Sequence, residues 1–163
     1  MKLHVGCGPK KLEGYKHQDV VAFPHVDYCC PAWEVPVADG TFEEIYSRHL
    51  FEHFYPWEAD DVLREWHRIL TDDGKIVMLL PDLAYHAKQL FLDGPCPVNP
   101  ITSNYDHAMA GFYGWVKKEK PYMAHHWGYT SRTICQKIAP YFYDIEIHRE
   151  HEWEIHLEAR GKK

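Results

Sequence analysis

The sequence predicts a three-layer α/β domain, in which helices cover both faces of a mostly parallel sheet. Short β-type segments alternate with helical ones along most of the 163 residues. A Gly-x-Gly turn, Gly6 to Gly8, directly follows the first β-type segment, as at the carboxyl end of a parallel strand. Two β-type segments, 141–148 and 153–159, lie close enough for an antiparallel hairpin. The expected sheet is therefore mostly parallel, with an antiparallel hairpin at its C-terminal end.

The expected elements follow in order along the chain. Before the hairpin, strands are expected near residues 2–6, 16–20, 24–28, 43–47 and 75–80. A helix is expected from about Trp57 to Leu70, because Pro56 precedes it and apolar residues recur at three-and-four spacing. Two further helices are expected at 83–92 and 130–138, the latter capped by Thr130 or Ser131.

Residues 94–129 interrupt this alternation. The stretch starts with a loop-like composition and continues with many aromatic side chains interspersed with histidines, among them His107, His125 and His126. Long loops are usually functional or disordered, and aromatic density argues against disorder. Two interpretations stay open: a lid over a substrate pocket, which we prefer, and a packed cluster that covers a sheet edge.

Composition narrows the class of protein. A chain of this length fits one domain spanning 1–163. The net charge of −6 argues against general nucleic-acid binding. The lack of a signal-peptide pattern or a long apolar run favours a cytoplasmic protein that does not bind membranes. Five cysteines without Cys-x-x-Cys spacing indicate reduced thiols, in agreement with that location.

The turn at Gly6 to Gly8 does not match two common phosphate-binding motifs. A dinucleotide fingerprint requires a third Gly or Ala three residues after Gly8, where this chain has Lys11. A P-loop requires Gly-Lys-Ser or Gly-Lys-Thr, and neither triplet occurs. The turn therefore predicts a cofactor of another kind.

The order of motifs over residues 2–83 closely resembles that of the class I S-adenosylmethionine-dependent methyltransferases, in particular their small-molecule, type 11 branch. The motifs that carry the resemblance are Gly6-Cys7-Gly8, Asp19 at a strand end, Val35-Pro36-Val37, the segment Ser47 to His53, the helix end Arg68-Ile69-Leu70, and Pro81-Asp82. The resemblance implies a Rossmann-like methyltransferase sheet, in a short form without N-terminal helices. It also implies a transferase that uses S-adenosylmethionine to methylate a small-molecule or glycan-type acceptor by in-line displacement.

The resemblance also implies which residues contact the cofactor. The main chain of Gly6, Cys7 and Gly8 would lie against the methionine and ribose portions, and Asp19 would accept hydrogen bonds from the ribose hydroxyls. Val35 and Pro36 would lie near the adenine, and Ser47, Arg48 and His49 near the methionine and sulfonium. In one departure from the family, the positions three to five residues before the Pro corner hold no acid. They are occupied by Cys30, Pro31, Ala32 and Trp33, and the nearest acid upstream of them is Asp27.

Methyl transfer depends mainly on holding the acceptor and the methyl group in line. A general base helps when the acceptor is a hydroxyl or an ammonium, and histidine suits that task near neutral pH. His49 is the first candidate because of its position after the fourth strand, and His125 and His126 are the next. Each could instead be a structural histidine.

Three alternatives stay open. The chain could be a non-catalytic cofactor-binding or partner-binding module on a shortened fold, and a homodimer could cover the open cofactor site. The segment His49-Leu50-Phe51-Glu52-His53 also matches the His-x-x-Glu-His pattern of zinc hydrolases, although its strand-end context does not suit a long helix. No metal ligand is assigned, but the thirteen histidines leave a metal site open, with His125 and His126 as contributors.

Overall fold

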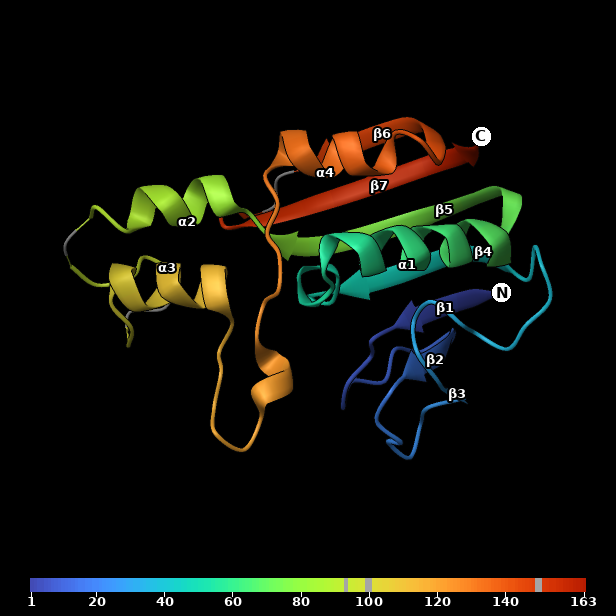
Figure 1. Cartoon of the computed structure of the whole chain (residues 1–163), viewed down its shortest axis with the longest axis horizontal. Coiled ribbons are helices and arrows are strands. Elements are labelled where there is room, and N and C mark those ends of the chain that lie inside the picture. Colours follow the sequence, from blue (N-terminus) through green and yellow to red (C-terminus); the bar gives the residue numbers. More distant parts are fainter. Residues whose placement is uncertain (93, 99–100, 149–150) are drawn as a thin grey trace.

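The computed structural model describes residues 1–92, 94–98, 101–148 and 151–163 (Figure 1). The strands of this described part are β1 (Lys2–Val5), β2 (Tyr15–Asp19), β3 (Tyr28–Cys29), β4 (Phe42–Arg48), β5 (Leu70–Pro81), β6 (Phe142–His148) and β7 (Glu154–Lys162). Its helices are the 3-10 helix η1 (Phe51–His53), α1 (Pro56–Ile69), α2 (Leu83–Gln89), α3 (Asn104–Tyr113), the 3-10 helix η2 (Pro121–Met123) and α4 (Ser131–Ile138).

The strands form one seven-stranded sheet with the order β3-β2-β1-β4-β5-β7-β6. The first five strands of this order are parallel, and β7 runs antiparallel to both β5 and β6. The register pairs Val5 with Ser47 and Asp19 with Cys29. The carboxyl ends of the parallel strands therefore meet at one edge, and the predicted Rossmann-like sheet, mostly parallel with a C-terminal antiparallel hairpin, is confirmed.

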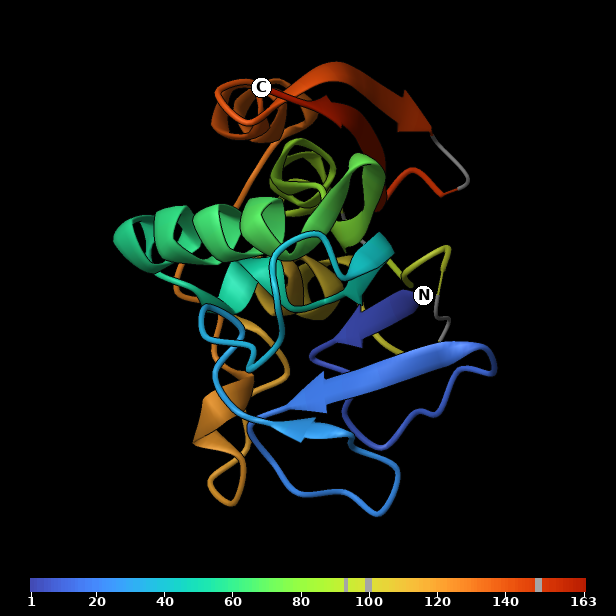
Figure 2. The same cartoon turned by 90° about the vertical axis from the view of Figure 1, so that its right-hand side faces the viewer.

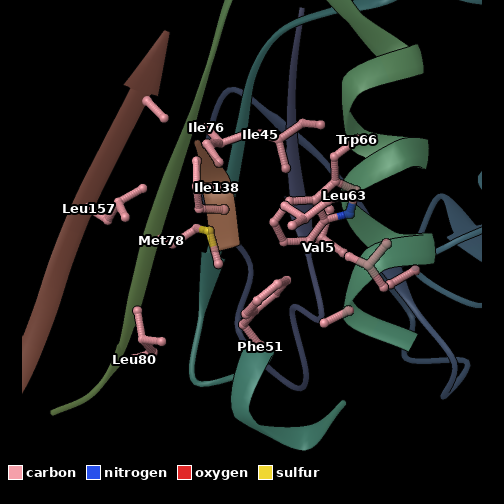
Figure 3. Packing of buried hydrophobic residues seen from close by; sticks show 14 of the residues in the cluster. Val5, Ile45, Phe51, Leu63, Trp66, Ile76, Met78, Leu80, Ile138 and Leu157 are labelled. Carbon is pink, nitrogen blue, oxygen red and sulfur yellow. The ribbon is translucent and has the colours of Figure 1, made fainter. Parts of the chain in front are cut away.

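Helices α1 and α4 pack on one face of the sheet (Figure 2). Helix α1 begins at Pro56, and the N–H of Tyr55 donates to the Glu58 carboxylate at 2.9 Å. Its apolar stripe is fully buried and consists of Ala59, Val62, Leu63, Trp66 and Ile69. Figure 3 shows Leu63 and Trp66 pointing from α1 toward Val5 and Ile45 of the sheet. This packing follows from the three-and-four spacing of apolar residues in the sequence.

The opposite face of the sheet has no helical layer among the described residues (Figure 2). Its strands present polar side chains that pair with one another: Lys75 lies 3.2 Å from Glu158 and 3.6 Å from Glu44. The connections 6–14 and 20–27 are loops, each shorter than an average helix of about 11–12 residues. The fold therefore differs from the three-layer prediction in this one respect, because those connections are too short to supply a second layer.

Helices α2 and α3 lie beyond the carboxyl ends of the parallel strands (Figure 1). Helix α3 falls within the segment 94–129 and was not predicted, although Ser103 is a recognisable cap whose hydroxyl accepts from the N–H of Asp106 at 3.0 Å. The two helices pack closely, because a Cβ at Gly111 would lie 2.3 Å from the His86 ring. The insert thus has its own helical support.

Smaller differences concern strand and helix ends. β3 is only two residues long, because Phe23 to Val26 form a turn closed by a 3.0 Å hydrogen bond from the Val26 N–H to the Phe23 carbonyl. β5 starts at Leu70, before the predicted residue 75, and α2 ends at Gln89, before the predicted residue 92. The predicted hairpin connection falls partly on residues 149–150, outside the described residues. Over the described ranges, no helix is both long enough and apolar enough to cross a bilayer.

Candidate active site

The turn after β1 contains two glycines in the left-handed region, Gly6 with φ 63° and Gly8 with φ 54°. They serve different purposes. A Cβ at Gly6 would lie 2.6 Å from Cδ1 of Leu50, so this glycine allows β1 to pack against the segment after β4. At Gly8, no atom of the described residues lies within 4 Å of the Cβ position. The loop therefore has open space at Gly8, next to the end of β1.

Asp19 ends β2 next to this turn. Its Oδ2 accepts the N–H of Gly8 at 2.7 Å, and its Oδ1 accepts the N–H of Val21 at 2.9 Å. A carboxylate has about four acceptor positions, so each oxygen can accept one more hydrogen bond. The structure thus brings two predicted cofactor residues together, and Asp19 keeps the capacity to accept from a pair of hydroxyls.

The Val35-Pro36 corner is held by α1. The N–H of Val35 donates to Glu65 at 2.8 Å, and Arg68 donates to the Val35 carbonyl at 3.1 Å. Asp27 does not replace the missing acid, because it pairs with Lys16 at 2.7 Å and accepts the N–H of His17 at 2.8 Å. Asp27 therefore has no free carboxylate oxygen to offer to an adenine in place of that acid.

The end of β4 is connected to β7 through Glu154. Ser47 is buried, and Arg48 Nε lies 3.2 Å from Glu154 Oε1. His49 Nε2 lies 2.9 Å from the same oxygen, and His49 Nδ1 lies 3.4 Å from Oε1 of Glu52. With φ 50°, His49 is the one non-glycine residue in the described part of the chain with a positive φ. Such an unfavourable conformation is often found at functional sites.

The surroundings of His49 favour its charged form. Burial disfavours that form, but the contacts with the carboxylates of Glu154 and Glu52 and their negative charges outweigh burial and raise the pKa of His49 to about 9. The pKa of Glu154 is lowered in turn, because His49 and Arg48 outweigh the opposing effect of its burial. Both ring nitrogens of His49 face carboxylates. To accept a proton from a substrate, His49 would first have to lose one of these contacts.

Glu52 and His125 bring the insert to the same edge of the sheet. His125 Nε2 lies 3.8 Å from Oε1 of Glu52, and its Nδ1–H donates to the Gly111 carbonyl at 3.0 Å. Burial lowers the pKa of His125, although the Glu52 charge acts in the opposite direction. The backbone N–H groups of His126 and Trp127 donate to the Glu52 carbonyl at 2.9 and 3.1 Å. The end of the insert is therefore fastened to η1.

The three candidate histidines thus separate into two groups. His49 and His125 both face Glu52, whereas the ring of His126 stacks on Tyr55 at 4.2 Å, with Trp57 stacked on Tyr55 at 4.7 Å. The zinc-hydrolase pattern is not formed, because η1 spans only Phe51–His53 and His49 lies outside it. Sequence reasoning missed Glu154 altogether and treated Glu52 only as part of that pattern.

The aromatic residues of the insert are largely exposed. Tyr113 is 61% and Trp115 53% exposed, and the same holds for Tyr105, Tyr122 and Trp127. These rings therefore do not form the packed cluster of one interpretation. Helix α3 of the insert itself lies beyond the carboxyl ends of the parallel strands (Figure 1).

Comparison with known proteins supports the predicted class of protein. Residues 9–78 match the family model described as "Methyltransferase domain". A search of curated protein sequences found no match. Solved structures with the same fold are numerous. One is 1,6-didemethyltoxoflavin-N1-methyltransferase from Burkholderia thailandensis, with bound 1,6-didemethyltoxoflavin and S-adenosylhomocysteine (TM-score 0.63, 15% identity, 99% of this chain and 71% of that one).

Two further structures extend the comparison. The PH0226 protein of Pyrococcus horikoshii has a TM-score of 0.65 and 16% identity over 99% of this chain and 81% of that one. A SAM-dependent methyltransferase of Methanosarcina mazei has a TM-score of 0.59 and 11% identity over 99% and 92% of the two chains. At these identities, the likeness establishes the fold. The family match over residues 9–78 agrees with the predicted class, the S-adenosylmethionine-dependent methyltransferases.

The residues present fit the ribose end of this cofactor. Gly8 borders open space, and Asp19 has unused acceptor positions beside it. The adenine end fits less well, because Asp27 is engaged elsewhere.

Proposed function

We propose that this protein transfers a methyl group from S-adenosylmethionine to a small-molecule or glycan-type acceptor bound between the sheet edge and the insert. The observation that carries the proposal is the 2.7 Å hydrogen bond from Gly8 to Asp19, at the edge where His49, Glu52 and His125 also meet. The close contact of Gly6 with Leu50 places these two groups of residues next to each other.

Each part of this edge has a task in the proposal. The open space at Gly8 admits the cofactor, Asp19 accepts from its ribose hydroxyls, and Ser47 to His49 border its methionine portion. When bound, the cofactor supplies an electrophilic methyl group on a sulfonium. The residues around it orient the acceptor in line with that methyl group, which can provide much of the rate.

Among the three candidate histidines, the geometry favours His125 for contact with an acceptor proton. Its Nδ1–H donates to the Gly111 carbonyl, so its Nε2 carries the lone pair, and this atom lies 3.8 Å from Oε1 of Glu52. His49 has no comparable free nitrogen, and His126 stacks on Tyr55 instead.

The exposed rings of the insert support a small acceptor. Tyr113 and Trp115 present apolar faces that could stack on a flat or cationic molecule. The Burkholderia enzyme, which has the same fold, holds the small molecule 1,6-didemethyltoxoflavin. A net charge of −6 gives no support to a polyanionic acceptor.

The test is a transfer assay with S-adenosylmethionine that carries a labelled methyl group, incubated with pools of metabolites and sugars. We expect the label to appear in at least one small molecule with the parent protein. Transfer should be lost in Gly8→Val and retained in Gly14→Val, because Gly14 has an equally open, left-handed conformation (φ 82°) but lies at the other end of the loop. Label that stays on the cofactor in every pool would favour the non-catalytic binding module.

A further inference from the structure

Glu52 is a buried acid without a hydrogen-bond donor for its carboxylate in the described part of the chain, although the ring of His49 lies 3.4 Å away. Its exposed fraction is 1%, and neither carboxylate oxygen has a hydrogen-bond partner among the described residues. Glu154, equally buried at 3%, is hydrogen-bonded by Arg48 and lies 2.9 Å from His49. Because buried polar atoms in proteins are nearly always hydrogen-bonded, the two oxygens of Glu52 require an explanation.

Two imidazoles stand next to this carboxylate. One donor atom each from Glu52, His53 and His125 lies within 4.8 Å of the other two. His53 Nδ1–H donates to the Ala124 carbonyl at 2.9 Å, and His125 Nδ1–H donates to the Gly111 carbonyl at 3.0 Å. Both hydrogen bonds leave Nε2 as the ring nitrogen with a lone pair. A carbonyl that holds the other nitrogen in this way is typical of metal-ligating histidines.

We propose that Glu52, His53 and His125 bind a divalent transition-metal ion of the zinc class. Two imidazole nitrogens and one carboxylate, with a coordination position left open, form a donor set that suits Zn²⁺. Mg²⁺ and Ca²⁺ prefer sites built from oxygen alone. In a tetrahedral site with bonds of about 2.0–2.1 Å, donors lie about 3.3 Å apart. The 3.8 Å between His125 Nε2 and Glu52 Oε1 therefore needs only a small side-chain adjustment.

The site joins two distant parts of the chain. Glu52 and His53 belong to η1, whereas His125 belongs to the end of the insert. A bound ion would strengthen the attachment that the backbone bonds of His126 and Trp127 to Glu52 already provide. Its open position could hold an oxygen of the methyl acceptor in place of direct contact with His125. Acceptor binding at the metal rests on the proposed methyl transfer, whereas metal binding itself does not.

The competing explanation is a metal-free ion-pair cluster, in which His49 at 3.4 Å and His125 at 3.8 Å compensate the charge of Glu52. Titration of the chelator-treated full chain with Co²⁺, in the absence of S-adenosylmethionine, distinguishes the two. We expect one Co²⁺ per chain with the visible absorption of a low-coordinate site, displaced by Zn²⁺ but not by Mg²⁺. The thermal midpoint should rise with added Zn²⁺, because the ion binds only the folded chain.

Variants make the assignment specific. Outer-shell partners alone contribute about 10–100-fold to metal affinity, so Glu52→Gln and His125→Ala should each weaken Co²⁺ binding by more than roughly 100-fold. His126→Ala is the matched control, because the ring of His126 stacks on Tyr55 and is not one of the three proposed metal ligands. The Co²⁺ affinity of this variant should equal that of the parent. Gly8→Val should also keep the metal while losing the cofactor, which separates this proposal from the proposed function.

Two results would overturn the proposal: no Co²⁺ or Zn²⁺ bound at millimolar concentration, or parental affinity in a folded Glu52→Gln variant. Circular dichroism establishes folding. If Glu52→Gln does not fold, His53→Ala takes its place with the same expected loss, and parental affinity there would overturn the proposal equally.

Discussion

The imidazole of His49 lies 2.9 Å from the carboxylate of Glu154, and this contact joins the end of β4 to the start of β7. Because β7 runs antiparallel to β5, its first residue lies at the edge where the parallel strands end. The C-terminal hairpin therefore contributes an acid to the candidate active site, besides extending the sheet.

Glu154→Gln should destabilise the protein. The change leaves His49 and Arg48 without their charged partner, which should cost about 1–3 kcal/mol of unfolding free energy at pH 7. His49 and Arg48 lower the pKa of Glu154 below its ordinary value of 4.5 in the folded state, although burial opposes this. The stabilisation is thus fully present above pH 4.5 and lost as the pH falls through the folded-state pKa.

Denaturant unfolding of both proteins between pH 3 and pH 7 measures this difference. The control is Glu146→Gln, because Glu146 is exposed on the neighbouring strand and should change stability by less than about 0.5 kcal/mol. A difference between parent and Glu154→Gln that stays constant down to pH 3 would show that the charge of Glu154 does not stabilise the fold.

Gly8→Val should abolish binding of S-adenosylhomocysteine, because its side chain would enter the open space next to Asp19. Gly14→Val introduces the same residue at another open glycine with positive φ, so it controls for backbone strain. Calorimetric titration of both variants measures the effect. Equal affinities in the two variants would mean that the turn after β1 does not border the cofactor.

Asp19→Asn should weaken cofactor binding by roughly 1.5–3 kcal/mol, the range for hydrogen bonds to a charged group. Asp27→Asn is the control, since Asp27 follows β2 but is engaged with Lys16 and His17. The same titration applies, with thermal unfolding to confirm that both variants fold. A loss below about 0.5 kcal/mol in Asp19→Asn would remove Asp19 from the cofactor site.

Trp115→Ala and Tyr113→Ala should raise the KM for the acceptor and leave kcat nearly unchanged, because exposed rings provide the same contact in the ground and transition states. Tyr143→Ala is the matched control, with an equally exposed ring on β6. Steady-state kinetics with the acceptor found in the transfer assay give both constants. Parental KM values in both insert variants would exclude these two rings from acceptor recognition.

Local patterns were sufficient to predict that the turn after the first strand and the acid after the second lie next to each other. The turn Gly6 to Gly8 and the acid Asp19 each follow a β-type segment, and parallel strands bring such ends together. The helix from Pro56 was predicted equally well, because its apolar spacing defines the buried face.

The charged part of the site could not be predicted in the same way. Glu154 reaches His49 only because β7 lies next to β5, a long-range pairing without a local signal. Glu52 and His125 meet through the path of the insert, including a helix whose Ser103 cap was overlooked. The second helical layer is missing among the described residues because the connections 6–14 and 20–27 are too short to supply it. The three-layer prediction considered the alternation of strands and helices but not the lengths of these connections.

The central claim is that the edge formed by Gly8, Asp19 and His49 binds S-adenosylmethionine. Calorimetric titration of the parent chain with S-adenosylmethionine and S-adenosylhomocysteine tests it most directly. The account predicts saturable binding of both at one site per chain, with loss in Gly8→Val. No heat of binding with either ligand at millimolar concentration would contradict it.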